Sequence, residues 1–160
     1  MPDGSSTGIG VSVKRKEDYR FLVGEGNYTD DINRPNQTYT YMLRSSSAHA
    51  KFTLNTSNAS KSNGVVKIFV GADMDVGSIP CGWQVDSKDG TPMREPAHPP
   101  IAKDKVRYVG EILAVVIADT IDDAKNAAEL IEVNYEDIPV IMNMKDAVDS
   151  SNGLVHEEIE

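Results

Sequence analysis

Several residue types are scarce in this 160-residue chain, and each scarcity excludes a class of function. The single cysteine, Cys81, rules out an internal disulfide framework and a zinc site made of cysteines alone. Aromatic residues make up only 6% of the chain, which disfavours aromatic stacking platforms for nucleic-acid bases. The 16 basic and 25 acidic residues give a net charge of −9, which also disfavours nucleic acid and anionic membrane surfaces as partners.

Long apolar runs are also missing. The longest, residues 112–118, is far shorter than a membrane span. The start, MPDGSSTGIG, has neither the basic region nor the apolar core of a signal peptide, so we expect a cytoplasmic protein. Residues 1–8 are small and polar and are expected to form a disordered leader, followed by a single domain over residues 9–160.

Hydrophobic periodicity predicts a chain of α+β or mixed α/β class. Alternating or β-branched runs predict strands over residues 38–44, 50–56, 65–71, 106–109 and 111–118. Apolar residues at three- and four-residue spacing from Ile121 to Ile131 then predict one main helix, with Thr120 and Asp123 as its capping pair. Residues 131–138 return to strand-like alternation and end before Pro139.

Weaker patterns predict four short features. A helical turn is expected near residues 17–21, followed by a turn at Gly24–Gly26. Residues 57–64 are expected to form a short helix that Gly64 ends, and residues 144–149 one more helical turn. The strand before the main helix is apolar throughout, as is typical of strands covered on both faces, whereas the strand after it alternates like an edge strand.

Residues 72–103 interrupt this pattern. They contain five of the eight prolines, the cysteine and the only tryptophan, with few apolar runs. We predict a long loop, and long loops in compact domains are often functional or form interfaces. Its aromatic, methionine and arginine content resembles that of protein interfaces, so the candidate interface residues are Trp83, Met93, Arg94 and Glu95.

No reaction centre is visible in the sequence. The glycines of Gly24–Gly26 lack the third glycine of a phosphate-binding loop. His49, His98 and His156 share no metal-ligand spacing, and Cys81 has no basic neighbour to lower its thiol pKa. We therefore predict no catalytic, cofactor-binding or metal-ligating residue in this chain.

Glu111 is the one acidic residue placed at the start of a buried strand, where a catalytic acid could stand. It follows Gly110 and lies close to Lys105 and Arg107. An ion pair or a hydrogen bond to a neighbouring loop explains such a position without chemistry, and we expect this structural role.

Three ordered stretches carry a family resemblance: IGVSVKRKEDYRFLVGEGNYTDDI, LRSSSAHAKFTLNTSNASKSNGVVKIFVGADM and DKVRYVGEILAVVIADTIDDAKNAAELIEVNYEDIPVI. Together they resemble the N-terminal part of the molybdenum-binding large subunit of the xanthine dehydrogenase and aldehyde oxidase family, in particular its aerobic carbon monoxide dehydrogenase branch. The resemblance runs from about Ile9 to the end. One departure is a serine in Arg44-Ser-Ser-Ser-Ala where the family usually has proline.

The resemblance implies an α/β hammerhead domain: a mixed β-sheet with one main helix and one or two short helices. Complete members are oxidoreductases that use a molybdopterin cofactor, with electrons leaving through iron–sulfur clusters and FAD. The family's cofactor segments and catalytic glutamate lie downstream, so no such residue is carried over here, and Glu111 matches a block that the family does not use as its catalytic acid.

Two functional hypotheses follow. In the first, the chain is a domain of a molybdenum hydroxylase large subunit, inactive in isolation, that packs against the molybdopterin-binding domain and the iron–sulfur and flavin partners. In the second, it is a standalone assembly module that docks a separately encoded molybdenum subunit. The residues that would select carbon monoxide, an aldehyde or a heterocycle as substrate are not in this region.

Overall fold

The computed structural model describes residues 8–10 and 14–157. The chain divides into two compact units, Met1–Gln37 and Thr38–Glu160. The leader predicted for residues 1–8 falls, apart from Gly8, outside the described residues.

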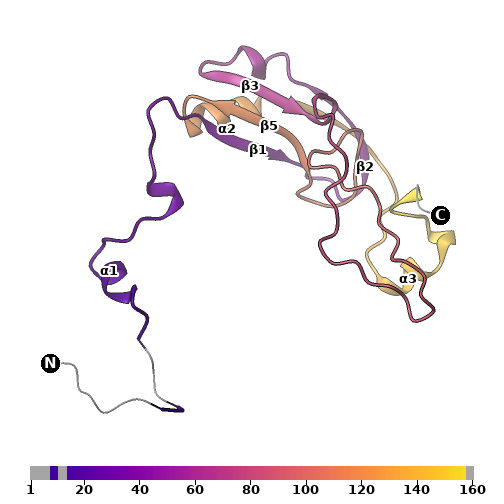
Figure 1. The fold of residues 1–160 in the computed structure, drawn as a ribbon. Coiled ribbons are helices and arrows are strands. Elements are labelled where there is room, and N and C mark those ends of the chain that lie inside the picture. The colour runs from indigo at the N-terminus through magenta and orange to yellow at the C-terminus, as the bar shows by residue number, and fades with distance from the viewer. Residues whose placement is uncertain (1–7, 11–13, 158–160) are drawn as a thin grey trace. The chain divides into compact units, whose positions relative to one another are not determined.

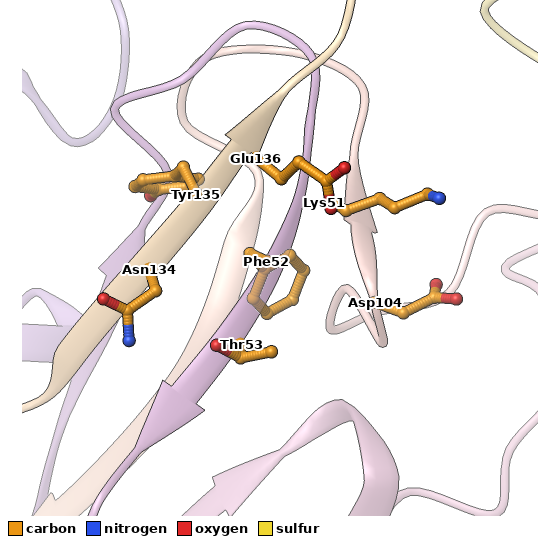
Figure 2. A pocket seen from close by; sticks show the side chains of 7 residues that line it. All are labelled: Lys51, Phe52, Thr53, Asp104, Asn134, Tyr135 and Glu136. Atoms are coloured by element: carbon orange, nitrogen blue, oxygen red, sulfur yellow. The ribbon is translucent and has the colours of Figure 1, made fainter.

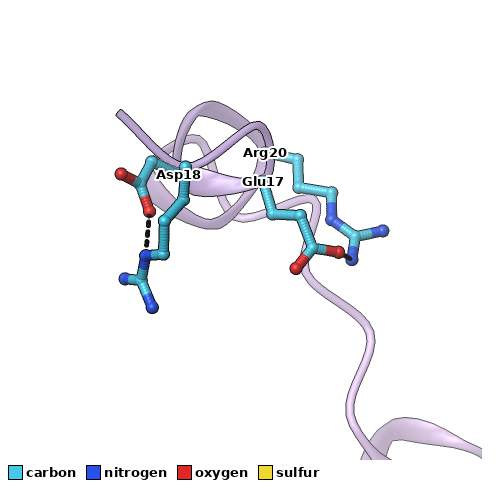
Figure 3. Close-up of polar contacts among 4 residues, drawn as sticks. Glu17, Asp18 and Arg20 are labelled. Carbon is cyan, nitrogen blue, oxygen red and sulfur yellow. Dashed lines mark hydrogen bonds and ion pairs between the residues drawn. The ribbon is translucent and has the colours of Figure 1, made fainter. Parts of the chain in front are cut away.

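The first unit contains one short helix, α1 (Asp18–Leu22), with charged side chains around it. Arg15 Nε lies 2.9 Å from Asp18 Oδ1, and Arg20 pairs with Glu17 one turn away (Figure 3). These groups are largely exposed, so each pair contributes at most a few tenths of a kcal/mol. The helix confirms the turn predicted near residues 17–21.

An aromatic stack and a glycine with positive φ define the course of the chain after α1. The rings of Phe21 and Tyr28 stack with their centroids 5.6 Å apart. The chain returns between them through Gly24, whose φ of 78° suits glycine, as predicted for this turn. A 3-10 helix, η1 (Thr29–Asp31), follows, and Asp31 Oδ2 accepts a hydrogen bond from Tyr28 N at 2.8 Å.

The second unit carries the sheets (Figure 1). Its elements, in chain order, are β1 (Tyr39–Arg44), β2 (Ala50–Asn55), η2 (Ala59–Lys61), β3 (Val65–Val70), η3 (Gly71–Asp73), β4 (Lys105–Val106), β5 (Ile112–Ala118), α2 (Ile121–Glu129), β6 (Glu132–Asp137), α3 (Met144–Val148) and η4 (Ser150–Asn152). This order of strands and helices confirms the α+β class.

The strands form two antiparallel sheets. Sheet A has the order β1-β5-β3, and sheet B has the order β4-β2-β6. Each recorded pairing is antiparallel, so the single mixed sheet of the expectation is here two separate sheets. Among the described strands β6 pairs only with β2, and it alternates in burial, which agrees with the edge strand predicted from its sequence.

Helix α2 packs on one face of sheet A and builds the larger core. Thr120 caps it by accepting a hydrogen bond from Asp123 N at 3.0 Å, as the sequence predicted. Ala124, Ala127 and Ala128 lie against Ala114 and Val116 of β5. Ile121 is 38% exposed, so the buried stripe of α2 begins at Ala124 and not at Ile121 as predicted.

A second core cluster lies at sheet B. It contains Ala50, Phe52, Ala102, Val106 and Leu113. Leu43, Leu54 and Val133 pack against both clusters, so the two cores are continuous. The sheets therefore fold as one unit.

Two strand predictions need correction. The strand predicted over residues 106–109 is only Lys105–Val106, because Arg107 N donates to Glu111 Oε2 at 2.6 Å and Gly110, with φ at 91°, turns the chain. β4 and β5 consequently belong to different sheets. The short helix predicted over residues 57–64 is a 3-10 turn, η2, ended by Gly64 with φ at 73°.

Candidate functional site

Residues 72–103 form a segment, the arm, that leaves the sheets after β3 and returns before β4 (Figure 1). The two ends of the arm are in contact with each other. A Cβ at Gly71 would lie 2.3 Å from the carbonyl oxygen of Ala102, and Ala102 N donates to Ile112 O at 2.8 Å. Ile101 and Ala102 are buried, so the arm is anchored in the core at its base.

The two halves of the arm run antiparallel and are joined by polar contacts rather than by a strand ladder. Ile79 N donates to His98 O at 2.8 Å, and His98 N donates to Ser78 Oγ at 2.6 Å. Further out, Glu95 accepts hydrogen bonds from Cys81 N and from Gln84 Nε2, the latter at 2.9 Å. The loop predicted here is thus an ordered hairpin-like extension.

The tip of the arm is a compact turn. Ser87 N donates to Thr91 O at 2.9 Å, and Gly90 turns the chain with φ at 82°. Asp89 Oδ1 accepts a hydrogen bond from Thr91 N at 3.0 Å. This backbone hydrogen bond, followed by one from the Thr91 side chain, lowers the pKa of the Asp89 carboxyl below its ordinary value.

The arm displays its apolar side chains to solvent. Trp83 is 80% exposed, and Ile79 and Val85 are also exposed. The exposed thiol of Cys81 donates a hydrogen bond to Trp83 O at 3.1 Å. This contact fixes the backbone at the tryptophan, while the indole ring stays outside the core. Exposed tryptophan on an ordered support is typical of protein-binding surfaces.

Three of the four predicted interface residues share one hollow. Its volume is about 470 Å³, and its lining consists of Ile79, Pro80, Cys81, Met93, Arg94, Glu95, Pro96 and His98. Trp83 is not in the lining and lies beyond the hollow along the chain. Sequence reasoning missed the prolines and His98, because only the antiparallel pairing of the two halves brings residues 79–81 opposite 93–98.

A second hollow, of about 370 Å³, lies on sheet B (Figure 2). Cross-strand neighbours line it: Lys51 is opposite Glu136, and Thr53 is opposite Asn134. Asp104 contributes from the segment before β4. These groups are exposed on an open sheet face, so they resemble an ordinary solvated surface rather than a site for general acid–base chemistry.

The buried polar side chains serve the backbone. Glu111 is only 5% exposed, and its carboxylate accepts from Arg107 N, which gives it the structural role expected from the sequence. His49 is 3% exposed and its Nδ1 lies 2.9 Å from Pro139 O, while its Nε2 has no hydrogen-bond partner among the described residues. Ser45 Oγ bonds within its own turn to Ser47.

Within residues 8–10 and 14–157, no group of three or more histidine, cysteine or acidic side chains is placed to hold a metal ion. The three histidines share no motif in the sequence and lie in three separate segments. His49 directly precedes β2, His98 lies in the arm, and His156 lies in the C-terminal segment.

Comparison with known families decides the assignment. Residues 23–139 match the family described as "Aldehyde oxidase and xanthine dehydrogenase, a/b hammerhead domain". The chain belongs to this family. The match covers both sheets, α2 and the whole arm, so the family and fold predicted from the three sequence stretches are confirmed.

Relatives place the hammerhead domain in longer chains. The chain is 34% identical to the nicotine 6-hydroxylase large subunit of Paenarthrobacter nicotinovorans over 143 residues, which are 88% of this chain and 17% of that protein. It is 32% identical to the carbon monoxide dehydrogenase large chain of Afipia carboxidovorans over 154 residues, 96% of this chain and 18% of that one. It therefore spans less than a fifth of each.

Solved structures agree with this assignment. The crystal structure of the Cu,Mo-CO dehydrogenase in its carbon monoxide reduced state matches with a TM-score of 0.77 and 31% identity, covering 94% of this chain and 18% of that one. The aldehyde oxidoreductase of Desulfovibrio desulfuricans, at 22% identity and a TM-score of 0.76 over 92% of this chain and 17% of that one, shares the fold. Among the described residues, no helix is long and apolar enough to span a membrane.

Proposed function

We propose that residues 9–160 act as the hammerhead domain of the large subunit of a molybdopterin-dependent oxidoreductase. The observation that carries this proposal is coverage: nearly the whole chain aligns with proteins more than five times longer, named for nicotine hydroxylation and carbon monoxide oxidation. We assign the domain a structural role inside such a chain, because its described residues hold no group of side chains placed to bind a metal ion. Its substrate chemistry belongs to the rest of the polypeptide.

The arm is the proposed contact surface. Trp83 supplies exposed aromatic area, and Met93, Arg94 and Glu95 supply an adaptable, partly apolar and charged hollow beside it. The base at Gly71 and Ala102 and the contacts of Glu95 hold these groups in place before any partner binds. An ordered arm loses less conformational entropy on docking than a flexible loop.

The partners proposed for this surface are the molybdopterin-binding domain of the large subunit and the iron–sulfur and flavin subunits or domains. The cofactors proposed for the complete enzyme are the molybdopterin cofactor, iron–sulfur clusters and FAD. The described residues provide no cluster of ligands for a metal and no glycine-rich phosphate loop, so these groups are assigned to the partners. The proposed location of the assembly is the cytoplasm.

The alternative function is a standalone assembly module that docks a separately encoded molybdenum subunit. The same arm would serve it, and the observation that favours it is that the arm is ordered within this chain itself. The two functions differ in the natural polypeptide that carries the sequence.

An immunoblot of source cells with an antibody against this chain separates them. A band several times larger than the 160-residue chain supports the domain of a large subunit. A band at the size of the chain contradicts it and supports the module. Molybdenum analysis of the purified 160-residue chain adds an independent test, because stoichiometric molybdenum would overturn the assignment of the cofactor to the partners.

A further inference from the structure

The outer face of sheet A, opposite α2, is apolar, and this chain covers it fully only at Leu113, which packs in the sheet B cluster. Direct cross-strand neighbours share a face, so Met42, Val115 and Phe69 form one row across β1, β5 and β3. Ile117 lies in the next row, opposite Lys67. Met42 is 42% exposed, and the other three apolar side chains are partly buried.

Two cations border this row. Lys67 Nζ lies 5.6 Å from the centroid of the Phe69 ring, and Arg44 Nη2 lies 3.8 Å from Met42 Sδ. Both contacts confirm that the charged and apolar side chains stand on the same face. The face is therefore apolar at its centre and cationic at its edges, within a chain whose net charge is −9.

Sheet B has one face that is exposed to solvent, and it provides a comparison. There the outward residues are polar in matched rows, Lys51 with Glu136 and Thr53 with Asn134. Sheet A departs from that alternation in its central strand, β5, which is apolar at all seven positions from Ile112 to Ala118. Such strands are typically covered on both faces. Helix α2 covers one face of β5, and the sheet B cluster covers the other face at Leu113 but not at Val115 and Ile117.

We propose that a segment of the large chain outside these 160 residues covers the outer face of sheet A, through an apolar surface bordered by carboxylates. This inference rests on the proposed function, in which the domain is less than a fifth of its polypeptide. The apolar row matches an apolar partner, and Arg44 and Lys67 match acidic side chains at its rim. A symmetric contact with a second copy is disfavoured, because it brings four cations together.

Thiol labelling of the natural polypeptide tests this. Met42→Cys places a thiol in the apolar row, and Thr40→Cys gives a second position on the same face, opposite Ile117. Thr53→Cys, on the polar face of sheet B, is the matched control. Alkylation by N-ethylmaleimide is followed at each position by peptide mass spectrometry, in the natural polypeptide and in the 160-residue chain.

In the natural polypeptide we expect alkylation at positions 42 and 40 to be slowed about tenfold or more, because only local opening then exposes the thiol. In the 160-residue chain we expect both positions to react as fast as position 53. Position 53 should react equally fast in both proteins.

Three outcomes overturn the proposal. Equal rates at positions 42 and 53 in a longer natural polypeptide leave the proposed function intact and refute only the covered face. Slow labelling already in the 160-residue chain means that this chain or a second copy covers the face, and sedimentation separates those two cases. A natural polypeptide no longer than this chain refutes the proposed function and this inference together.

Discussion

At the base of the arm, Gly71 has no room for a side chain. A Cβ there would lie 2.3 Å from Ala102 O and 2.8 Å from Lys103 Cα, both backbone atoms that cannot move aside cheaply. We expect Gly71→Ala to lower the free energy of unfolding by about 1–3 kcal/mol, since the arm must shift to accept the methyl group. Denaturant unfolding of the 160-residue chain measures this.

Gly77 is the matched control for that substitution. It lies in the arm, and a Cβ there would meet nothing within 4 Å. Gly77→Ala should change stability by less than about 0.5 kcal/mol. Equal effects at the two glycines would contradict the close contact at the base.

Thr120 carries the cap of the main helix. Its Oγ1 accepts from Asp123 N at 3.0 Å, and no other described side chain is recorded as capping that end. Thr120→Ala should lower the free energy of unfolding by about 1 kcal/mol because a backbone N–H of the first turn loses its acceptor. Thr120→Ser keeps the hydroxyl and should recover most of that loss in the same thermal or denaturant measurement.

At the scale of single elements, the tip of the arm should respond to acid. The pKa of Asp89 is lowered in the folded chain, so the carboxylate stabilises the tip above the ordinary pKa, and this contribution is lost as pH falls through the lowered value. We expect exchange of the Thr91 amide hydrogen, corrected for its intrinsic pH dependence, to lose protection over that range.

Asp89→Asn provides the control for the acid response. The amide side chain can still accept from Thr91 N but does not titrate, so the pH dependence at Thr91 should disappear while the turn persists. A pH response of equal size in this variant would assign the effect to another group. Asp149, whose pKa is lowered by Ser151, is remote in sequence and serves as an internal comparison.

Local elements were predictable from the sequence where one pattern dominates. The alternation of residues 38–44 and the three- and four-residue spacing after Thr120 place β1 and α2 correctly. Residues 106–109 looked like a strand because valine and tyrosine favour strands, but a carboxylate five residues from Val106, Glu111, binds the backbone of Arg107 and ends the strand. A local hydrogen bond of this kind leaves no periodic pattern in the sequence from which it could be predicted.

Pairing between distant segments was not predictable. The sequence could not show that β4 and β5 enter different sheets, because strand partners are chosen by contacts across tens of residues. For the same reason the sequence pointed to Met93, Arg94 and Glu95 of the hollow in the arm, which are neighbours in sequence, but not to Ile79 and His98, which line the same hollow. Their approach depends on the antiparallel course of the arm.

At the scale of the whole molecule, Trp83 should matter for assembly and not for folding. The side chain is 80% exposed, so Trp83→Ala should change the stability of the 160-residue chain by less than about 0.5 kcal/mol. In the complete enzyme the same substitution should weaken subunit or domain association by about 2 kcal/mol or more, as for aromatic hot spots. Dissociation followed by analytical ultracentrifugation measures this.

Met142→Ala is the matched comparison, because Met142 is 86% exposed and lies outside the arm. It should leave association unchanged. Loss of stability in the isolated Trp83→Ala chain, or an equal effect of both variants on association, would argue against the arm as the docking surface.

The closed base of the arm has a consequence for how such domains can diversify. Because the chain enters at Gly71 and leaves at Ala102 in direct contact, the segment between them is a self-contained insertion. A short glycine linker can bridge those ends at a small entropic cost, so the arm can be shortened, exchanged or grafted while both sheets keep their register. Under the proposed function, recognition by the arm and folding of the sheets are then separable properties of one polypeptide, and a change of partner requires no change in the core.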